Sequence, residues 1–243
     1  MYKTFLFFMS ITLFILLFSL GVSAKEYSDT EHWAKNYINY VTDQGYFEGT
    51  TNSTFEPDGV MTRGMFVTAL ARYEKADLSK YKLDPFNDIT NDQYFTKPIL
   101  WAYENNIVEG VSSNIFAPND AITREQSATI INRYLSMKNN VPIGISIVEE
   151  QIAYFNDINT VSSWALIPVK NMKNLNIFKG DQNNNFNPKN NLTRAECAVI
   201  FSRLDNKSFE NYTPPTPVYT YLSGKASAYS EGLVGDLPQV VRD

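Results

Sequence analysis

A unit of fixed spacing occurs three times in this chain and limits the possible folds more than any other feature. Each copy contains a Thr-Arg pair, followed nine residues later by a second arginine. Counting back from the first arginine, each copy has a proline at 6 residues, a phenylalanine at 8, a glycine at 14 and an aromatic residue at 30. The Thr-Arg pairs are Thr62-Arg63, Thr123-Arg124 and Thr193-Arg194. So many shared positions predict one supersecondary unit used three times.

Each unit is predicted to contain a helix, a polar loop and a second helix. Pro98 and Pro168 share one repeat position, and proline fits only the first turn of a helix, so the first helix begins there. Phe66, Leu70 and Tyr73 form an apolar stripe after the first Thr-Arg pair, which predicts the second helix. One such pair buries too little surface to be stable alone. We therefore expect an all-α fold in which three helix-loop-helix repeats pack with pseudo-threefold symmetry around a central three-helix bundle.

Composition removes several classes of function. The chain has 243 residues, with 21 Lys plus Arg against 26 Asp plus Glu, and its net charge of −5 argues against a nucleic-acid partner. One cysteine excludes an intramolecular disulfide and a cysteine-based zinc site. His32 is the only histidine and therefore the only candidate base for a Ser-His-type catalytic triad. No catalytic residue, metal or cofactor is expected, and the chain is not expected to be an enzyme.

The two ends of the chain differ from the repeats. Lys3, an apolar run over 5–20 and a small residue at Ala24 predict a signal peptide, residues 1–24, that is cleaved after Ala24. The alternative is a retained membrane anchor, but the run is short for a spanning helix, so no integral membrane segment is expected after cleavage. The repeats are then assigned to 25–80, 81–140 and 141–207, and 208–243 to a Pro-rich linker and a short tail. Cys197, in an apolar run, is expected to be a core thiol.

The repeats resemble the S-layer homology (SLH) domain family. The resemblance rests on an opening Asn-Asp or Ser-Asp, a first helix that starts at Trp33-Ala34, the glycine, the Phe-x-Pro and a Thr-Arg-Ala-Glu box, and it spans 27–204. The third copy has the full box, the second has Thr-Arg-Glu-Gln, and the first departs with Gly64-Met65. The resemblance implies a three-pronged helical module that anchors secreted proteins non-covalently to the cell wall of a Gram-positive-type bacterium, at the cell surface or in its S-layer. The implied partner is secondary cell-wall polysaccharide linked to peptidoglycan, with a pyruvylated amino-sugar terminus bound in grooves between repeats.

The candidate carbohydrate-binding residues occupy four repeat positions. They are the Thr-Arg arginines Arg63, Arg124 and Arg194, the aromatics Trp33, Tyr94 and Trp164, the acids Asp29, Asp88 and Asp157, and the glycines Gly49, Gly110 and Gly180. An arginine in the first turn opposes the helix dipole, so it is expected either to pair with a loop carboxylate or to bind an anion together with the free helix N–H groups. A pyruvate carboxylate would be a suitable anion for the second alternative, because arginine can bind it with two hydrogen bonds.

The other three positions also have two interpretations each. The aromatics are either core residues or platforms for the apolar face of a sugar. The acids either cap the first helix or form a turn that leads into it, or else they accept hydrogen bonds from sugar hydroxyls. The glycines are expected to have a positive φ where the first helix ends, with close approach by a ligand as the alternative. The second arginines, Arg72, Arg133 and Arg203, are expected to form ion pairs between repeats, with ligand contact as the alternative.

The Thr-x-x-Glu part of the box predicts a capping box in the second helix. Glu196 and Gln126 can return a hydrogen bond to the threonine N–H, whereas Met65 cannot. Gly64 also lowers helix propensity. We therefore expect the helix that begins at Arg63 to fray, and the groove that uses Arg63 to be the weakest of the three.

Three functions fit these expectations. The first is a wall-binding module without catalysis. The second is the wall-anchoring region of a cell-wall or polysaccharide-processing enzyme whose catalytic domain is missing from this chain. The third is a scaffold that self-assembles through the module.

Overall fold

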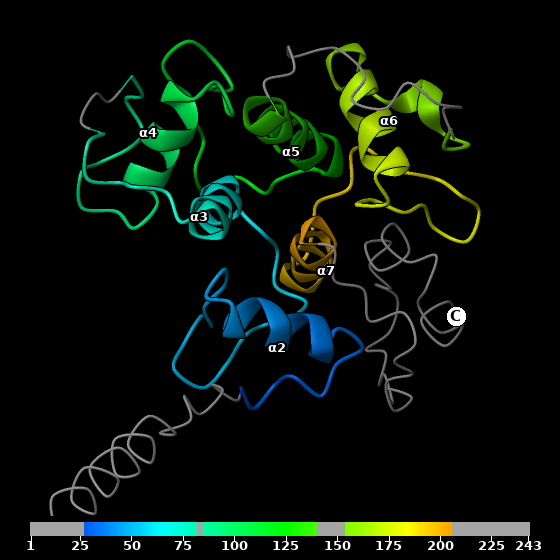
Figure 1. Ribbon diagram of the computed structural model, residues 1–243, viewed down its shortest axis with the longest axis horizontal. Coiled ribbons are helices and arrows are strands. Elements are labelled where there is room, and N and C mark those ends of the chain that lie inside the picture. Colours follow the sequence, from blue (N-terminus) through cyan, green and yellow to red (C-terminus); the bar gives the residue numbers. More distant parts are fainter. Residues whose placement is uncertain (1–26, 82–84, 140–153, 206–243) are drawn as a thin grey trace, which may run out of the picture.

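The computed structural model describes residues 27–81, 85–139 and 154–205, and these residues form an all-α structure (Figure 1). The predicted signal peptide at 1–24 and the predicted linker and tail at 208–243 lie outside the described residues. The first helices of the three copies are α2 (Lys35–Asp43), α4 (Thr96–Glu104) and α6 (Leu166–Asn174). Two short 3₁₀ helices, η1 (Ile158–Thr160) and η2 (Ser163–Ala165), precede α6. The second helices are α3 (Arg63–Glu74), α5 (Arg124–Asn139) and α7 (Arg194–Leu204), so the predicted helix-loop-helix order is confirmed.

The helices pair across the sequence repeats. Helix α4 packs on α3 and α6 packs on α5, so a first helix contacts the second helix of the preceding copy. Helix α2, in the first copy described, packs on α7 of the third, so this pair joins the first copy to the third. In Figure 1, α3, α5 and α7 lie on the inside, and α2, α4 and α6 lie around them. Each packed pair therefore combines two sequence repeats.

A cycle of backbone hydrogen bonds connects the residues that precede the three second helices. The N–H of Met61 donates to the carbonyl of Leu192 at 2.8 Å, Leu192 donates to Ile122 at 3.1 Å, and Ile122 donates to Met61 at 2.9 Å. All three side chains are buried. Since each copy donates to one neighbour and accepts from the other, the three helix starts are held in a fixed mutual arrangement.

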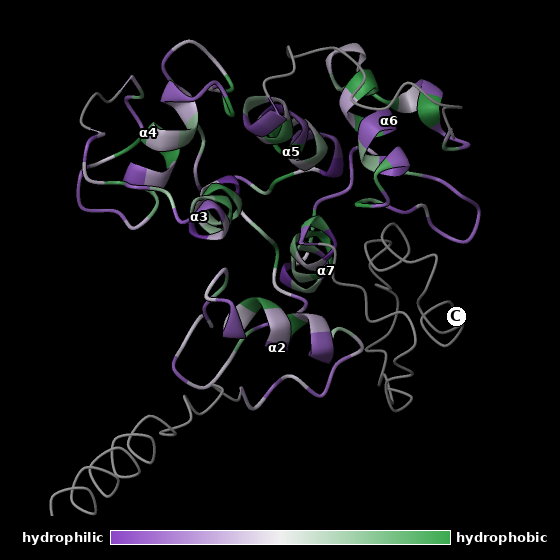
Figure 2. Ribbon diagram, viewed as in Figure 1, coloured by the Kyte–Doolittle hydropathy of each residue, from purple (hydrophilic) through white to green (hydrophobic). Residues whose placement is uncertain are grey.

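The buried apolar side chains form one cluster with members from all three copies. Aromatic rings join the second helices: Phe66 of α3 lies 5.4 Å from Phe201 of α7, and Tyr73 of α3 lies 6.0 Å from Tyr134 of α5, both measured between ring centroids. Cys197 is fully buried, as expected for a core thiol, and burial raises the pKa of that thiol. The outer loops are mostly hydrophilic (Figure 2). Among the described residues, no helix is both long and apolar enough to cross a membrane.

Candidate ligand-binding grooves

Two cavities lie between neighbouring copies and have corresponding walls. The first groove, of about 330 Å³, is lined by Gly49, Thr68, Arg72, Tyr94 and Arg194, among others. The second groove, of about 390 Å³, is lined at matching repeat positions by Gly110, Thr129, Arg133, Trp164 and Arg63. Each groove thus combines a loop and a second helix from one copy, an aromatic residue from the next copy and a Thr-Arg arginine from the preceding one.

The Thr-Arg arginines bind backbone carbonyls of a neighbouring copy. In Arg194, Nε donates to the carbonyl of Phe55 and Nη2 donates to that of Glu48, both at 2.7 Å. The guanidinium also lies 4.4 Å from the centroid of the Phe55 ring. The other two arginines repeat this arrangement, Arg63 with the carbonyls of Phe116 and Glu109, and Arg124 with those of Phe186 and Lys179.

This arrangement differs from both expectations for these arginines, an ion pair and an anion site. Burial lowers the pKa of all three guanidinium groups, to about 10 for Arg124. Arg63 and Arg194 still line the two grooves, whereas Arg124 has no exposed surface. Ligand contact by these residues stays a prediction. Their observed role is to join each second helix to the loop of the next copy in the cycle.

The N-terminal N–H groups of the second helices are occupied, so the expectation that they bind an anion is wrong. In α3, the N–H of Arg63 donates to the carbonyl of Asp120 at 2.9 Å, and that of Gly64 donates to Pro118 at 2.8 Å. The next N–H, of Met65, donates to Thr62 Oγ1 at 3.2 Å. Helices α5 and α7 begin with the same three kinds of contact. These neighbouring loops take the acceptor positions that an anion would need.

The capping box is complete in two copies. The N–H of Thr193 donates to Glu196 Oε2 at 3.0 Å, and the N–H of Thr123 donates to Gln126 Oε1 at 3.1 Å. Met65 has no group that could accept such a bond. Helix α3 nevertheless begins at Arg63, and the carbonyls of Asp120 and Pro118 and the hydroxyl of Thr62 hold its first turn, which argues against the expected fraying.

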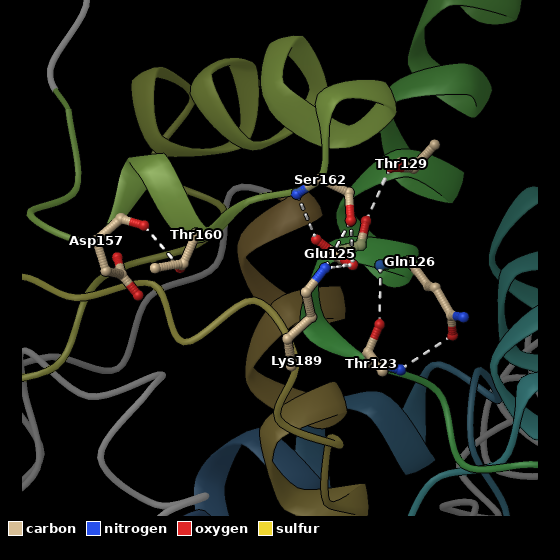
Figure 3. Close-up of polar contacts among 8 residues, drawn as sticks. All are labelled: Thr123, Glu125, Gln126, Thr129, Asp157, Thr160, Ser162 and Lys189. Atoms are coloured by element: carbon tan, nitrogen blue, oxygen red, sulfur yellow. Dashed lines mark hydrogen bonds and ion pairs between the residues drawn. The ribbon is translucent and has the colours of Figure 1, made fainter.

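Glu125 of α5 binds two residues of the third copy, a role that was not predicted from the sequence. Its carboxylate accepts from the N–H of Ser162 at 3.0 Å and from the hydroxyl of Ser162 at 3.1 Å, and it pairs with Lys189 (Figure 3). Gly64 and Ala195 stand at this repeat position in the other copies, so this contact belongs to the α5–α6 junction. The sequence did contain a signal for this contact: Glu125 is acidic, whereas the other two copies have a small residue at the same repeat position.

The three aspartates lie in the turn that precedes each first helix, as one interpretation expected, but their carboxylates hold the Phe-x-Pro loops, so the expectation that they cap the helices is wrong. The carboxylate of Asp88 accepts from the N–H groups of Phe116 and Ala117 at 2.9 and 2.7 Å. Asp29 and Asp157 bind the corresponding N–H groups of their own copies. The residue between Phe and Pro is left-handed each time, with φ of 58° at Glu56, 59° at Ala117 and 55° at Asn187. Each carboxylate thus stabilises a sharp bend whose phenylalanine lies against an arginine, and sugar contact by the aspartates stays a prediction.

The repeat glycines are needed for space and not for a positive φ. Gly45 is the one described glycine with a positive φ, so the expectation for Gly49, Gly110 and Gly180 is wrong. A Cβ at Gly49 would lie 2.3 Å from the Tyr27 ring, and one at Gly110 would lie 2.3 Å from the carbonyl of Ser112. A Cβ at Gly180 would lie 2.9 Å from the backbone of Asn184. The atoms that lie so close to each glycine belong to the same copy and not to a ligand. Gly49 and Gly110 also line the grooves.

The three aromatics divide between the two interpretations. Trp33 is 7% exposed and belongs to the core, while Tyr94 is 59% and Trp164 is 54% exposed. Tyr94 borders the first groove and Trp164 the second. Two grooves therefore carry an exposed ring that a sugar could reach.

Comparison with known proteins identifies the repeats. The S-layer homology domain model matches residues 27–64, 85–128 and 154–198. The chain is 36% identical over 173 residues to an endoglucanase of Bacillus sp. (strain KSM-635), an alignment that covers 71% of this chain and 18% of that protein.

Two further relatives represent an enzyme and a surface-layer protein. Identity is 34% to an amylopullulanase of Thermoanaerobacterium thermosulfurigenes and 28% to a surface-layer 125 kDa protein of Lysinibacillus sphaericus. These alignments cover 76% and 73% of this chain, but 10% and 14% of the relatives. The chain thus spans less than a fifth of each relative. On the family match and the three corresponding units, this chain belongs to the S-layer homology domain family and carries three copies of that domain.

Proposed function

We propose that this chain is a non-catalytic module that anchors a protein to the cell wall by binding secondary cell-wall polysaccharide. The supporting observation is that two grooves with matching walls each set an exposed aromatic ring beside a helix that carries arginine. Cavity volumes of about 330 and 390 Å³ fall at the lower end of the range for small-ligand pockets. The second helices α3, α5 and α7 would form the central three-helix bundle of a pseudo-threefold module that presents the grooves.

The proposed ligand is the pyruvylated amino-sugar terminus of the wall polymer. An aromatic ring offers a flat apolar surface to the C–H face of a sugar. A guanidinium forms charge-assisted, bidentate hydrogen bonds with a carboxylate, which gives preference for an acidic sugar over a neutral one. The proposed location is the cell surface of a Gram-positive-type bacterium, reached by secretion with the predicted leader at 1–24.

Binding to purified wall polysaccharide tests this proposal. The polymer is offered before and after chemical removal of its pyruvate, and bound protein is measured by sedimentation with peptidoglycan-linked polymer and by calorimetry. We expect binding to the intact polymer and a loss of at least tenfold in affinity after pyruvate removal. Equal retention on peptidoglycan stripped of its polysaccharide would contradict the proposal.

A second candidate function is the wall-anchoring region of an enzyme that acts on polysaccharides. It is favoured by relatives that are named amylopullulanase, exoglucanase and endoglucanase and are much longer than this chain. We propose that the described module itself has no hydrolytic activity, and incubation with pullulan, xylan, cellulose and cell walls tests this point. A third candidate, self-assembly, predicts a particle mass that rises with concentration in light scattering, without any wall polymer.

A further inference from the structure

Each groove contains an ion pair whose two members differ in exposure. In the first groove, Arg72 Nη2 lies 3.0 Å from Glu48 Oε2, with side chains 34% and 69% exposed. In the second, Arg133 Nη2 lies 3.1 Å from Glu109 Oε2, with side chains 19% and 73% exposed. Both pairs form within one copy, so the expectation that these arginines pair between repeats is wrong for both. The glutamates stand in solvent while the arginines lie partly within the grooves.

These second arginines are better placed to meet a ligand than the Thr-Arg arginines. Arg194 and Arg63 use Nε and Nη2 for buried backbone carbonyls and lie against phenylalanine rings. Releasing them would leave those carbonyls without a donor. Arg72, in contrast, forms its described hydrogen bond with the exposed carboxylate of Glu48. Releasing Arg72 from Glu48 leaves both groups able to contact water.

The second arginines share a helix face with other residues that line the grooves. Arg72 follows Thr68 and Ala69 by four and three residues, so the three share one face of α3, and all three line the first groove. Thr129, Ile130 and Arg133 repeat this pattern on α5 in the second groove.

The exposed rings lie close to these cations. Tyr94 lines the first groove together with Arg72 and Arg194, and Trp164 lines the second together with Arg133 and Arg63. Tyr94 and Arg72 therefore border the same space. A sugar that stacks on the ring can direct an acidic substituent at the guanidinium.

We propose that Arg72 and Arg133 bind the carboxylate of the wall polymer, and that Glu48 and Glu109 are internal competitors which the ligand carboxylate displaces. This inference rests on the proposed wall-polysaccharide function. An exposed ion pair contributes little to stability, so its exchange is easy. A carboxylate held within the groove is less screened by water than Glu48 or Glu109, and it can bind the guanidinium with both oxygens.

The third copy has a different charge pattern. Lys179 occupies the repeat position of Glu48 and Glu109, and Arg203, which is 8% exposed, occupies that of Arg72 and Arg133. Two cations cannot form the exchangeable ion pair. We therefore expect two exchange sites in each module, in the first and second grooves.

The test compares three double variants on the full chain, with pyruvylated wall polysaccharide as the probe. Arg72→Gln with Arg133→Gln is expected to lower affinity at least tenfold. Glu48→Gln with Glu109→Gln is expected to raise affinity two- to tenfold, because the competing carboxylates are gone. The matched control is Glu31→Gln with Lys35→Gln, an exposed ion pair with side chains 74% and 34% exposed that lies outside the two grooves; its affinity should not change.

Opposite effects of the arginine and glutamate variants separate exchange from a structural ion pair. If both pairs of substitutions weaken binding equally, or if the arginine variant binds like wild type, the inference is overturned while the proposed function stands. If wild type fails to bind the polymer, the proposed function falls and the inference with it. Thermal melting checks that each variant is folded. If the glutamine variant unfolds, the affinity of Arg72→Lys with Arg133→Lys is measured instead. Lysine keeps the positive charge but cannot bind a carboxylate in a bidentate manner, so we expect an affinity between those of wild type and the glutamine variant.

Discussion

The guanidinium of Arg194 lies 4.4 Å from the ring centroid of Phe55, and its Nε donates to the Phe55 carbonyl at 2.7 Å across 139 residues of chain. This contact joins the last copy to the first. Arg63 and Arg124 make the corresponding contacts with the second and third copies. The residue type that most strongly marks the repeat in the sequence therefore also closes the cycle of three copies.

Arg194→Ala should destabilise the protein. It removes two charge-assisted hydrogen bonds and leaves the carbonyls of Phe55 and Glu48 without this donor, so we expect the free energy of unfolding to fall by roughly 3 kcal/mol. Urea unfolding followed by circular dichroism measures this change. Arg72→Ala is the control and should cost less than about 1 kcal/mol, because it removes an exposed ion pair. Equal costs for the two variants would contradict the structural role of Arg194.

Ala117→Gly should stabilise the protein. Ala117 has a φ of 59°, which is unfavourable for alanine and available to glycine, and its N–H is held there by Asp88. Relief of that strain, less the added entropy of the unfolded chain, gives an expected gain of about 0.5 kcal/mol. Asn187→Gly at the same repeat position should gain less, since asparagine tolerates this conformation better. Melting temperatures compare the two, and a lower melting temperature for Ala117→Gly would contradict the prediction.

The sequence predicts the helices and their starts because these depend on local chemistry. The Thr-Arg pairs mark the first residues of α3, α5 and α7, and Thr62, Thr123 and Thr193 bond to the N–H three residues on. The exchange of partners between copies could not be predicted in this way. Periodicity identifies the apolar face of α2, but nothing within 35–43 states that this face meets α7.

The sequence predicted several of the residues that line the grooves, but it did not predict what the aspartates and the Thr-Arg arginines bind. The position that holds Tyr94 and Trp164 was expected to allow exposed rings, and both do line grooves. The aspartates and Thr-Arg arginines instead bind backbone groups that a repeat pattern does not display, since each copy contains the same loop N–H and carbonyl groups. Position in the repeat therefore signals importance without distinguishing ligand contact from loop support.

Gly64→Ala should destabilise the protein, although helix propensity alone predicts a gain of up to about 1 kcal/mol. A Cβ at Gly64 would lie 3.0 Å from the Pro118 carbonyl and 3.1 Å from the Phe95 ring. The carbonyl cannot withdraw, because it accepts from the N–H of Gly64 at 2.8 Å. We expect a net loss of about 1 kcal/mol, in the lower range for overpacking. In α7 the same position holds Ala195, so Ala195→Gly should also destabilise, and a rise in melting temperature for either variant would contradict this account.

Glu196 should make stability fall as the pH rises. Burial raises the pKa of its carboxyl from an ordinary value of 4.5 to about 8, against the opposing effect of the nearby Arg124 charge. Between those two pH values the folded chain keeps a proton that the unfolded chain releases. The unfolded state therefore binds fewer protons, and this group's contribution to stability is lost progressively from about pH 4.5 to about pH 8, by at most about 1.4 kcal/mol per pH unit.

Glu196→Gln removes this dependence without removing the capping box. Gln126 already makes the same bond in α5, where its Oε1 accepts from the N–H of Thr123 at 3.1 Å. We expect the variant to melt at nearly the same temperature at pH 5 and pH 8, and above wild type at pH 8. The exposed control Glu31→Gln should keep the wild-type slope. If wild type and Glu196→Gln show the same slope between pH 5 and pH 8, the buried carboxyl does not titrate in this window and the prediction is wrong.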